Sequence, residues 1–180
     1  MSGVQNINTQ KISLQGSGSI FLTGFMGSGK TYWGKKWAQG LGREFIDLDE
    51  LLEKEERQTI AEIFAGKGEA YFRRLETNTL RRLGKRNDLL IATGGGTPCF
   101  DDNISWMNNN GTTVYLRSSP ANIAARLVIE KEKRPLLKNL NDNELLFYIT
   151  EKIKERELFY NQAKIILDVD DLPEDHIQKL

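Results

Sequence analysis

Cysteine and histidine are almost absent from this sequence, which contains only Cys99 and His176. A single cysteine excludes a disulfide within the chain and suits a reducing compartment. Long apolar runs are also missing: no stretch approaches the roughly 18 residues of a membrane span, and the first residues lack the charged and then apolar pattern of a signal peptide. We therefore expect a cytoplasmic protein whose chemistry does not rely on a histidine base.

Neither charge is in excess, because 25 lysines and arginines stand against 25 aspartates and glutamates. The chain therefore lacks the overall basic charge that draws proteins to nucleic acids or anionic membranes, and any anion-binding site is local. Its 180 residues fit one domain with a sizeable core, and 39% hydrophobic residues are too many for a disordered chain. We expect a monomer that binds a small molecule, and neither nucleic acid nor a membrane.

Short apolar runs alternate with longer segments of helical periodicity along the chain. Residues 1–18 are polar and end in Gly-Ser-Gly, so they are expected to form a flexible lead before a single domain over residues 19–180. The strand candidates are the apolar runs 19–23, 44–48, 88–93, 112–116 and 164–169. Five strands separated by helices predict an α/β fold with a parallel sheet covered by helices on both faces.

Local signals mark the ends of several helices. Thr59 and Glu62 form a capping box, Pro120 is placed for a first helical turn, and helices are expected to stop at Gly42 and Gly84. Two helices carry an apolar face, which consists of Phe72, Leu75, Thr79, Leu80 and Leu83 in one and of Leu145, Leu146, Ile149 and Ile153 in the other.

An apolar run at residues 20–22 leads into GFMGSGKT, residues 24–31, and a helical pattern follows. The stretch matches the phosphate-binding pattern GxxxxGK[ST] in both letters and context. Glycines allow the loop to turn successive N–H groups inward, while the helix that begins near Lys30 directs the positive end of its dipole at the same hollow. We therefore expect a nucleoside triphosphate, with Lys30 reaching its β and γ phosphates and the Thr31 hydroxyl coordinating Mg²⁺.

Asp47 and Asp49 close the second apolar run in the sequence Asp-Leu-Asp. Residues two apart in a strand face the same side, so both carboxylates are expected at the carboxyl edge of the sheet, where the glycine loop also lies. One carboxylate could hold water around Mg²⁺, and the other could orient a hydroxyl nucleophile or accept its proton. The alternative is that Asp49 only caps the helix that follows.

Three further features have both a functional and a structural interpretation. The glycines at 94–96 follow the third strand candidate, where a ligand or a second backbone could approach closely, or where the chain could simply turn. Arg73 lies near Glu76 on an amphipathic helix, a pattern typical of a solvated charge cluster. Arg134 lies in a charged, proline-bounded segment that is either an exposed loop or a lid that closes over the phosphates.

GFMGSGKT, DLD, FRRLE, GGG, RPLL and RELFY occur in the order and rough spacing of the shikimate kinase family, which the chain resembles from about residue 20 to about residue 169. The resemblance implies a P-loop NTPase fold of the nucleotide-kinase type, a three-layer sandwich with a lid at about residues 126–142. It also implies an enzyme that uses ATP and Mg²⁺ to phosphorylate the 3-hydroxyl of shikimate, a step toward chorismate and the aromatic amino acids.

The same resemblance implies a role for each motif residue. ATP would be bound by the loop residues Gly27, Ser28, Gly29, Lys30, Thr31 and Tyr32, by Arg126 beside the adenine and by the lid residue Arg134. Shikimate would be bound by Asp49, Gly94, Gly95 and Gly96, with Arg73 and Arg156 on its carboxylate. The catalytic residues would be Lys30, Asp49 as the base, and Arg134, and Mg²⁺ would be held by Thr31 and, through water, by Asp47.

Two other functions stay open at this point. A kinase for another small polyol acid, such as gluconate, could share the scaffold, although Arg73, Arg156 and the glycine turn favour shikimate. A nucleotide switch or a non-catalytic ATP-binding module is the alternative outside enzymes, but the chain has no NKxD guanine signature. The acidic segment DVDDLPED after the last strand candidate departs from the basic or polar loop of many relatives, so the adenine side is left unassigned there.

Overall fold

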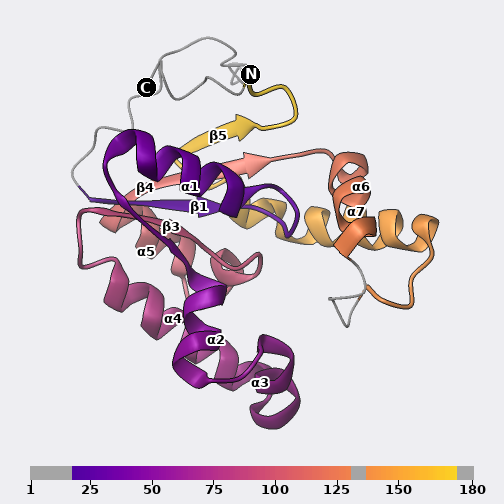
Figure 1. Cartoon of the computed structure of the whole chain (residues 1–180), viewed down its shortest axis with the longest axis horizontal. Helices are drawn as coiled ribbons and strands as arrows, with labels where there is room; N and C mark the ends of the chain where they lie inside the picture. The colour runs from indigo at the N-terminus through magenta and orange to yellow at the C-terminus, as the bar shows by residue number, and fades with distance from the viewer. Residues whose placement is uncertain (1–17, 131–136, 174–180) are drawn as a thin grey trace.

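The computed structural model describes residues 18–130 and 137–173. Within these ranges five strands form one parallel sheet in the order β2-β3-β1-β4-β5, as the alternation of strands and helices predicts (Figure 1). The strands are β1 (Ser19–Thr23), β2 (Glu44–Asp47), β3 (Leu89–Ala92), β4 (Gly111–Arg117) and β5 (Ile165–Asp168). The helices are α1 (Lys30–Leu41), α2 (Leu48–Glu56), α3 (Ile60–Lys67), α4 (Glu69–Leu83), the 3₁₀ helix η1 (Thr97–Cys99), α5 (Asn103–Asn110), α6 (Pro120–Glu130) and α7 (Asp142–Tyr160).

The sheet separates two apolar clusters because successive side chains of a strand point to opposite faces. Ile20 and Leu22 of β1 pack on one face with Trp37 of α1. Phe21 points to the other face and packs with apolar side chains of α2, α3, α4 and α5. Figure 1 shows α1 on one side of β1 and the helices α4 and α5 on the other. The central strand is therefore buried on both faces, which explains its unbroken apolar run.

A third apolar cluster anchors the loop that follows β1. Phe25 of this loop is 2% exposed and packs with residues of α6 and α7, which lie together at one end of the sheet in Figure 1. The other buried members of the cluster are Ile123, Leu127, Leu137, Leu145 and Ile149. The described parts of the expected lid, residues 126–130 and 137–142, thus flank this cluster, whereas Arg134 lies outside the described residues.

The expected helix ends are confirmed. Thr59 and Glu62 make both hydrogen bonds of a capping box, and Gly42 ends α1 with a left-handed φ of 65°. The prediction wrongly placed Leu146 on the apolar face of α7: Leu146 is 39% exposed, whereas its neighbour Leu145 is fully buried. None of the helices in the described ranges is both long enough and apolar enough to cross a membrane.

The second strand ends earlier than its apolar run predicts. Asp47 is the last residue of β2, and Leu48 already belongs to α2. The Asp47 carboxylate causes this switch, since it accepts hydrogen bonds from the backbone N–H groups of Asp49 at 3.1 Å and Glu50 at 3.4 Å. The capping residue is therefore Asp47 rather than Asp49. The strand alternation used to place these two carboxylates on one side does not apply.

Candidate active site

The loop after β1 adopts a conformation that requires glycine. Gly24, Gly27 and Gly29 have φ angles of 142°, 77° and 92°, in the region that L-residues rarely adopt. A Cβ at Gly24 would also lie 2.8 Å from the carbonyl oxygen of Leu116 and 2.8 Å from Ser28 Oγ. The loop therefore curls tightly between β1 and the start of α1, and its glycines permit that path.

The inside of this loop has the chemistry of an anion site. Lys30 Nζ folds back over the loop and donates to the carbonyl oxygens of Gly24 at 2.8 Å and Phe25 at 2.9 Å. Ser28 Oγ is buried and has no hydrogen-bond partner among residues 18–130 and 137–173. The first N–H groups of α1 add the positive end of the helix dipole. An unpartnered hydroxyl, a lysine and a helix N-terminus together suit a phosphate group.

A hydroxyl and a carboxylate meet beside the loop. Thr31 Oγ1, in the first turn of α1, donates to Asp47 Oδ2 at 2.7 Å. The bond joins the glycine loop to the carboxyl end of β2, two strands away across the sheet. Oxygen donors of this kind match Mg²⁺, which binds few protein ligands and retains waters and phosphate oxygens. Thr31 and Asp47 are therefore brought together as predicted.

Asp49 lies in the first turn of α2, and its carboxyl group has a raised pKa. Burial and, after it, the nearby carboxylates of Glu76 and Asp47 together raise the pKa of this carboxyl to about 7, against the opposing effect of Lys30. Gly94 lies against the same group, because a Cβ there would stand 2.8 Å from Asp49 Oδ1. A carboxyl group that titrates near neutral pH can accept and release a proton, as a general base must.

Arg73 and Glu76 form a buried pair instead of the solvated cluster that their spacing suggests. The Glu76 side chain is 1% exposed and that of Arg73 is 15% exposed, and Nη1 of the arginine donates to Oε2 of the glutamate at 2.9 Å. Thr97 donates its hydroxyl hydrogen to the other carboxylate oxygen of Glu76. Burial raises the pKa of Glu76, while Thr97 and Arg73 act to lower it. Because Arg73 and Glu76 are three positions apart on one helix, the sequence indicated that they pair, but it did not indicate that the pair is buried.

Each glycine of the 94–96 turn lies against a different site residue. A Cβ on Gly94 would come into contact with the carboxylates of both Asp49 and Glu76. A Cβ on Gly95 would lie 3.5 Å from Nη1 of Arg156, and one on Gly96 would lie 2.8 Å from Nη1 of Arg73. The turn thus brings Asp49, Arg73 and Arg156 around one stretch of backbone. A second backbone approaches as well, because a Cβ on Gly95 would lie 3.3 Å from the backbone nitrogen of Met26.

Tyr160 supports this turn and Phe25 contacts Arg156 beside it; both residues lie within sequence motifs, but neither was predicted to have a role of its own. The hydroxyl of Tyr160 donates to the carbonyl oxygen of Gly95 at 2.5 Å, and its ring stacks on Tyr115 with centroids 4.9 Å apart. The guanidinium carbon of Arg156 lies 5.5 Å from the ring centroid of Phe25. Arg156 is one helical turn before Tyr160 on α7, so this helix supplies both a charge and a support to the turn.

Arg126 lies on α6 beside the glycine loop. Its Nη1 donates to the carbonyl oxygen of Gly27 at 3.0 Å, and its Nη2 is 3.7 Å from Oδ1 of Asp170. Tyr32 follows the loop, is 53% exposed, and meets Trp33 edge to face with ring centroids 5.2 Å apart. Both residues therefore lie next to the loop, and Tyr32 is exposed to solvent there.

The comparison with known protein families agrees with this geometry. The family model described as shikimate kinase matches residues 26–180. The chain belongs to the shikimate kinase family. A shikimate kinase of Bacteroides fragilis is 46% identical over 153 residues, which cover 85% of this chain and 86% of that relative.

Solved structures of this family have the same fold. A crystal structure of shikimate kinase from Bacteroides thetaiotaomicron is 41% identical, has a TM-score of 0.86, and covers 91% of this chain and 96% of that one. Shikimate kinase from Acinetobacter baumannii in complex with shikimate is 32% identical, with a TM-score of 0.80 and 94% of each chain covered. A deoxyadenosine kinase from M. mycoides with bound dATP, at 15% identity and a TM-score of 0.53, shares the fold.

The raised pKa of Asp49 predicts how the stability of this shikimate kinase family member depends on pH. The folded chain binds a proton at Asp49 up to a pH of about 7, whereas the unfolded chain loses it near the ordinary value of 3.8. Folding therefore takes up a proton between these values, and the free energy of unfolding falls as the pH rises. Asp49→Asn removes this loss. Urea unfolding without Mg²⁺ or nucleotide should show the variant gaining roughly 1–3 kcal/mol on the parent between pH 5 and pH 8.

Asp88→Asn is a matched control for this measurement. Asp88 is an exposed carboxylate whose pKa is lowered by its hydrogen bond from Arg86, so it is ionised throughout this pH range in both states. Its substitution should change stability by the same amount at pH 5 and pH 8. Parallel pH curves for Asp49→Asn and the parent chain would show that Asp49 is not acting as described.

Proposed function

We propose that this chain is a kinase that transfers the γ-phosphoryl group of ATP to the 3-hydroxyl of shikimate, which yields shikimate 3-phosphate and ADP in the biosynthesis of chorismate and the aromatic amino acids. Membership of the shikimate kinase family supports the proposal. The observation that carries it is the convergence of Asp49, Arg73 and Arg156 on the 94–96 turn, beside the glycine loop. A small hydroxylated carboxylate needs this combination of an acceptor for its hydroxyls and guanidinium groups for its acid.

The loop residues bind the triphosphate in this proposal. The backbone N–H groups of Gly27, Ser28 and Gly29 and the start of α1 surround the phosphates, and Lys30 moves from the loop carbonyl oxygens to the phosphate oxygens. Arg126, which donates to Gly27, and Tyr32, which follows the loop, are assigned to the rest of the nucleotide.

Mg²⁺ fits the pair that Thr31 and Asp47 form, since both supply oxygen donors. When bound, the ion would neutralise charge on the phosphate oxygens. Thr31 would coordinate it directly and Asp47 through water. Their hydrogen bond in the present structure keeps both groups in place for that role.

The hydroxyl side of the reaction depends on Asp49. Its carboxylate accepts the proton of the substrate hydroxyl as the new bond forms between that oxygen and the γ phosphorus, while the bond from the γ phosphorus to the bridging oxygen breaks and ADP leaves. Lys30 stabilises charge on the phosphate oxygens. Arg134, expected from the family resemblance to meet the same group, lies outside the described residues. Positioning and charge stabilisation dominate phosphoryl transfer, so these few side chains suffice.

The carboxylate of the substrate is assigned to Arg73 and Arg156. Both guanidinium groups approach the glycine turn, and buried Glu76 keeps one N–H of Arg73 fixed. Nε and Nη2 of Arg73 donate at 3.2 Å and 3.0 Å to Oε1 of Glu69, whose side chain is 58% exposed. Because the Glu69 carboxylate is open to solvent, it regains water when it leaves Arg73, so the substrate can displace it more easily than the buried Glu76.

A coupled assay of ADP release tests the substrate. ATP and Mg²⁺ should give fast ADP release with shikimate and little with gluconate or with no acceptor, and chelation of Mg²⁺ should abolish it. Faster release with gluconate would identify a different polyol acid kinase. Tight ATP binding without release for any acceptor in the panel would identify a non-catalytic module.

Asp49→Asn tests the proposed base. The amide keeps the size of the side chain but cannot accept the proton, so kcat should fall by about 10²–10⁴-fold. ATP affinity should change little, as measured by calorimetry in Mg²⁺, because the phosphates are assigned to the glycine loop. Turnover within twofold of the parent enzyme would remove Asp49 from the mechanism.

Arg73→Ala and Arg74→Ala form a matched pair on neighbouring positions of α4. Loss of the Arg73 guanidinium should raise the KM for shikimate about 10–100-fold, the range for a charge-assisted hydrogen bond of 1.5–3 kcal/mol. Arg74 lines a depression on another face of the helix and should leave the KM unchanged. Steady-state kinetics with each substrate varied in turn distinguishes the two. Equal effects of both substitutions would indicate a general loss of helix stability instead.

A further inference from the structure

The guanidinium group of Arg73 lies among three aromatic rings. Its carbon is 5.3 Å from the ring centroid of Phe72, 5.8 Å from that of Phe64 and 4.2 Å from that of Phe100. Phe72 is buried in the core cluster and Phe64 packs against it, whereas Phe100 is 36% exposed and follows η1. The ring nearest to Arg73 is therefore Phe100, the one of the three that does not belong to the apolar core cluster. A cation within about 6 Å of an aromatic face is attracted to it electrostatically.

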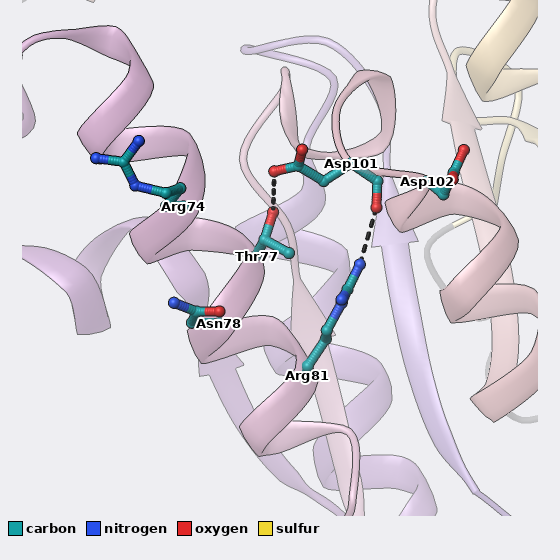
Figure 2. Close-up of a pocket in the computed structure, with 6 residues that line it drawn as sticks. All are labelled: Arg74, Thr77, Asn78, Arg81, Asp101 and Asp102. Carbon is teal, nitrogen blue, oxygen red and sulfur yellow. Dashed lines mark hydrogen bonds between the residues drawn. The ribbon is translucent and has the colours of Figure 1, made fainter.

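The chain is fastened to α4 on both sides of Phe100. Figure 2 shows the bonds after it: Thr77 Oγ1 donates to Asp101 Oδ2 at 3.1 Å, and Arg81 Nη2 donates to the carbonyl oxygen of Asp101 at 2.9 Å. Before it, the Thr97 hydroxyl hydrogen-bonds to the buried glutamate of α4. Asp101 has a φ of 48°, which L-residues rarely adopt, so these bonds hold a bend that the chain would not otherwise favour. The bend places Phe100 against Arg73.

We infer that Phe100 is a positioning residue for the substrate, and that its ring holds the guanidinium of Arg73 where the carboxylate of the substrate binds. This inference rests on the proposed function, which assigns that carboxylate to Arg73. When the substrate displaces Glu69, Arg73 loses the partner of its Nε and Nη2 groups. The ring of Phe100 then restricts the rotamers of the Arg73 side chain before the substrate binds. Less rotamer entropy is therefore lost on binding.

Two substitutions of Phe100 separate the aromatic contact from simple packing. Phe100→Leu keeps an apolar side chain but removes the π face, and should raise the KM for shikimate by roughly fivefold to thirtyfold. Phe100→Tyr retains the ring and should restore a KM close to that of the parent enzyme. Because the ring acts on Arg73 alone, the KM for ATP and kcat should change by less than about twofold in both variants. A shikimate KM that is equal in all three proteins would overturn the inference.

The hydrogen bonds of Asp101 offer a second test at Thr77, one helical turn after Arg73 on α4. Thr77→Val removes the hydroxyl that donates to the Asp101 carboxylate and should raise the KM for shikimate in the same direction as Phe100→Leu, by a smaller factor. Asn78→Ala changes a residue that lines the same depression in Figure 2 and should have no effect on this KM. A raised KM in both variants, or in neither, would count against a role for these bonds in placing Phe100.

Nuclear magnetic resonance tests the contact without any substrate. A proton held over an aromatic face is shifted upfield by the ring current, so the Hε resonance of Arg73, assigned with Arg73→Lys, should move downfield in Phe100→Leu and stay in place in Phe100→Tyr. An unchanged Hε resonance in Phe100→Leu would overturn the inference even if the enzyme phosphorylates shikimate. Absence of shikimate-dependent ADP release from the parent protein would instead overturn the proposed function, while the resonance would still show whether the ring covers Arg73.

Discussion

The buried carboxylate of Glu76 is the constraint around which the site is arranged. A carboxylate taken out of water is strongly destabilising unless charges and hydrogen bonds compensate it. Arg73 supplies the charge at 2.9 Å and Thr97 supplies a hydroxyl, so the glutamate joins α4 to the turn that follows β3. Together with burial, which is the larger cause, the same negative charge raises the pKa of Asp49. One buried group thus sets the direction of a guanidinium, the path of a glycine turn and the acidity of a neighbouring carboxyl.

The strand order explains why residues from distant parts of the chain meet there. β1 lies between β3 and β4, so the glycine loop after β1 is adjacent to the glycine turn after β3, and β2 places Asp47 next to that turn. Parallel strands bring all their carboxyl ends to one edge of the sheet, where loops are free to carry chemistry. The two glycine-rich segments have different tasks. The first turns its own backbone groups inward, whereas the second lets side chains of α2, α4 and α7 approach the backbone.

The sequence allowed the fold and the glycine loop to be predicted, because both depend on local patterns: apolar runs, caps, and glycines before a lysine and a threonine. Prediction from the sequence failed where a contact between residues far apart in the chain determines the structure. Asp47 was expected to share a strand with Asp49, but its carboxylate caps α2 and ends β2 one residue early. Arg73 and Glu76 suggested a solvated cluster because their spacing is common on surfaces, and only Thr97, 21 residues later, reveals the burial. Phe100 belongs to no motif, and Tyr160 ends the RELFY segment without a role that the segment alone could assign, since the roles of both residues arise from the chain that folds beside them.

The acidic segment after β5 can also be understood from its contacts. Burial by itself would raise the pKa of Asp170, but hydrogen bonds from the Ser118 hydroxyl and the Ser119 backbone N–H outweigh it and lower the pKa, so the group is ionised at neutral pH. Its charge faces Arg126, which in turn donates to the glycine loop at Gly27. A negative charge near a triphosphate would ordinarily repel it. Here Arg126 offsets the charge of Asp170, and Asp170 also joins the end of β5 to the residues between β4 and α6, so this carboxylate is compatible with an anionic ligand in the neighbouring loop.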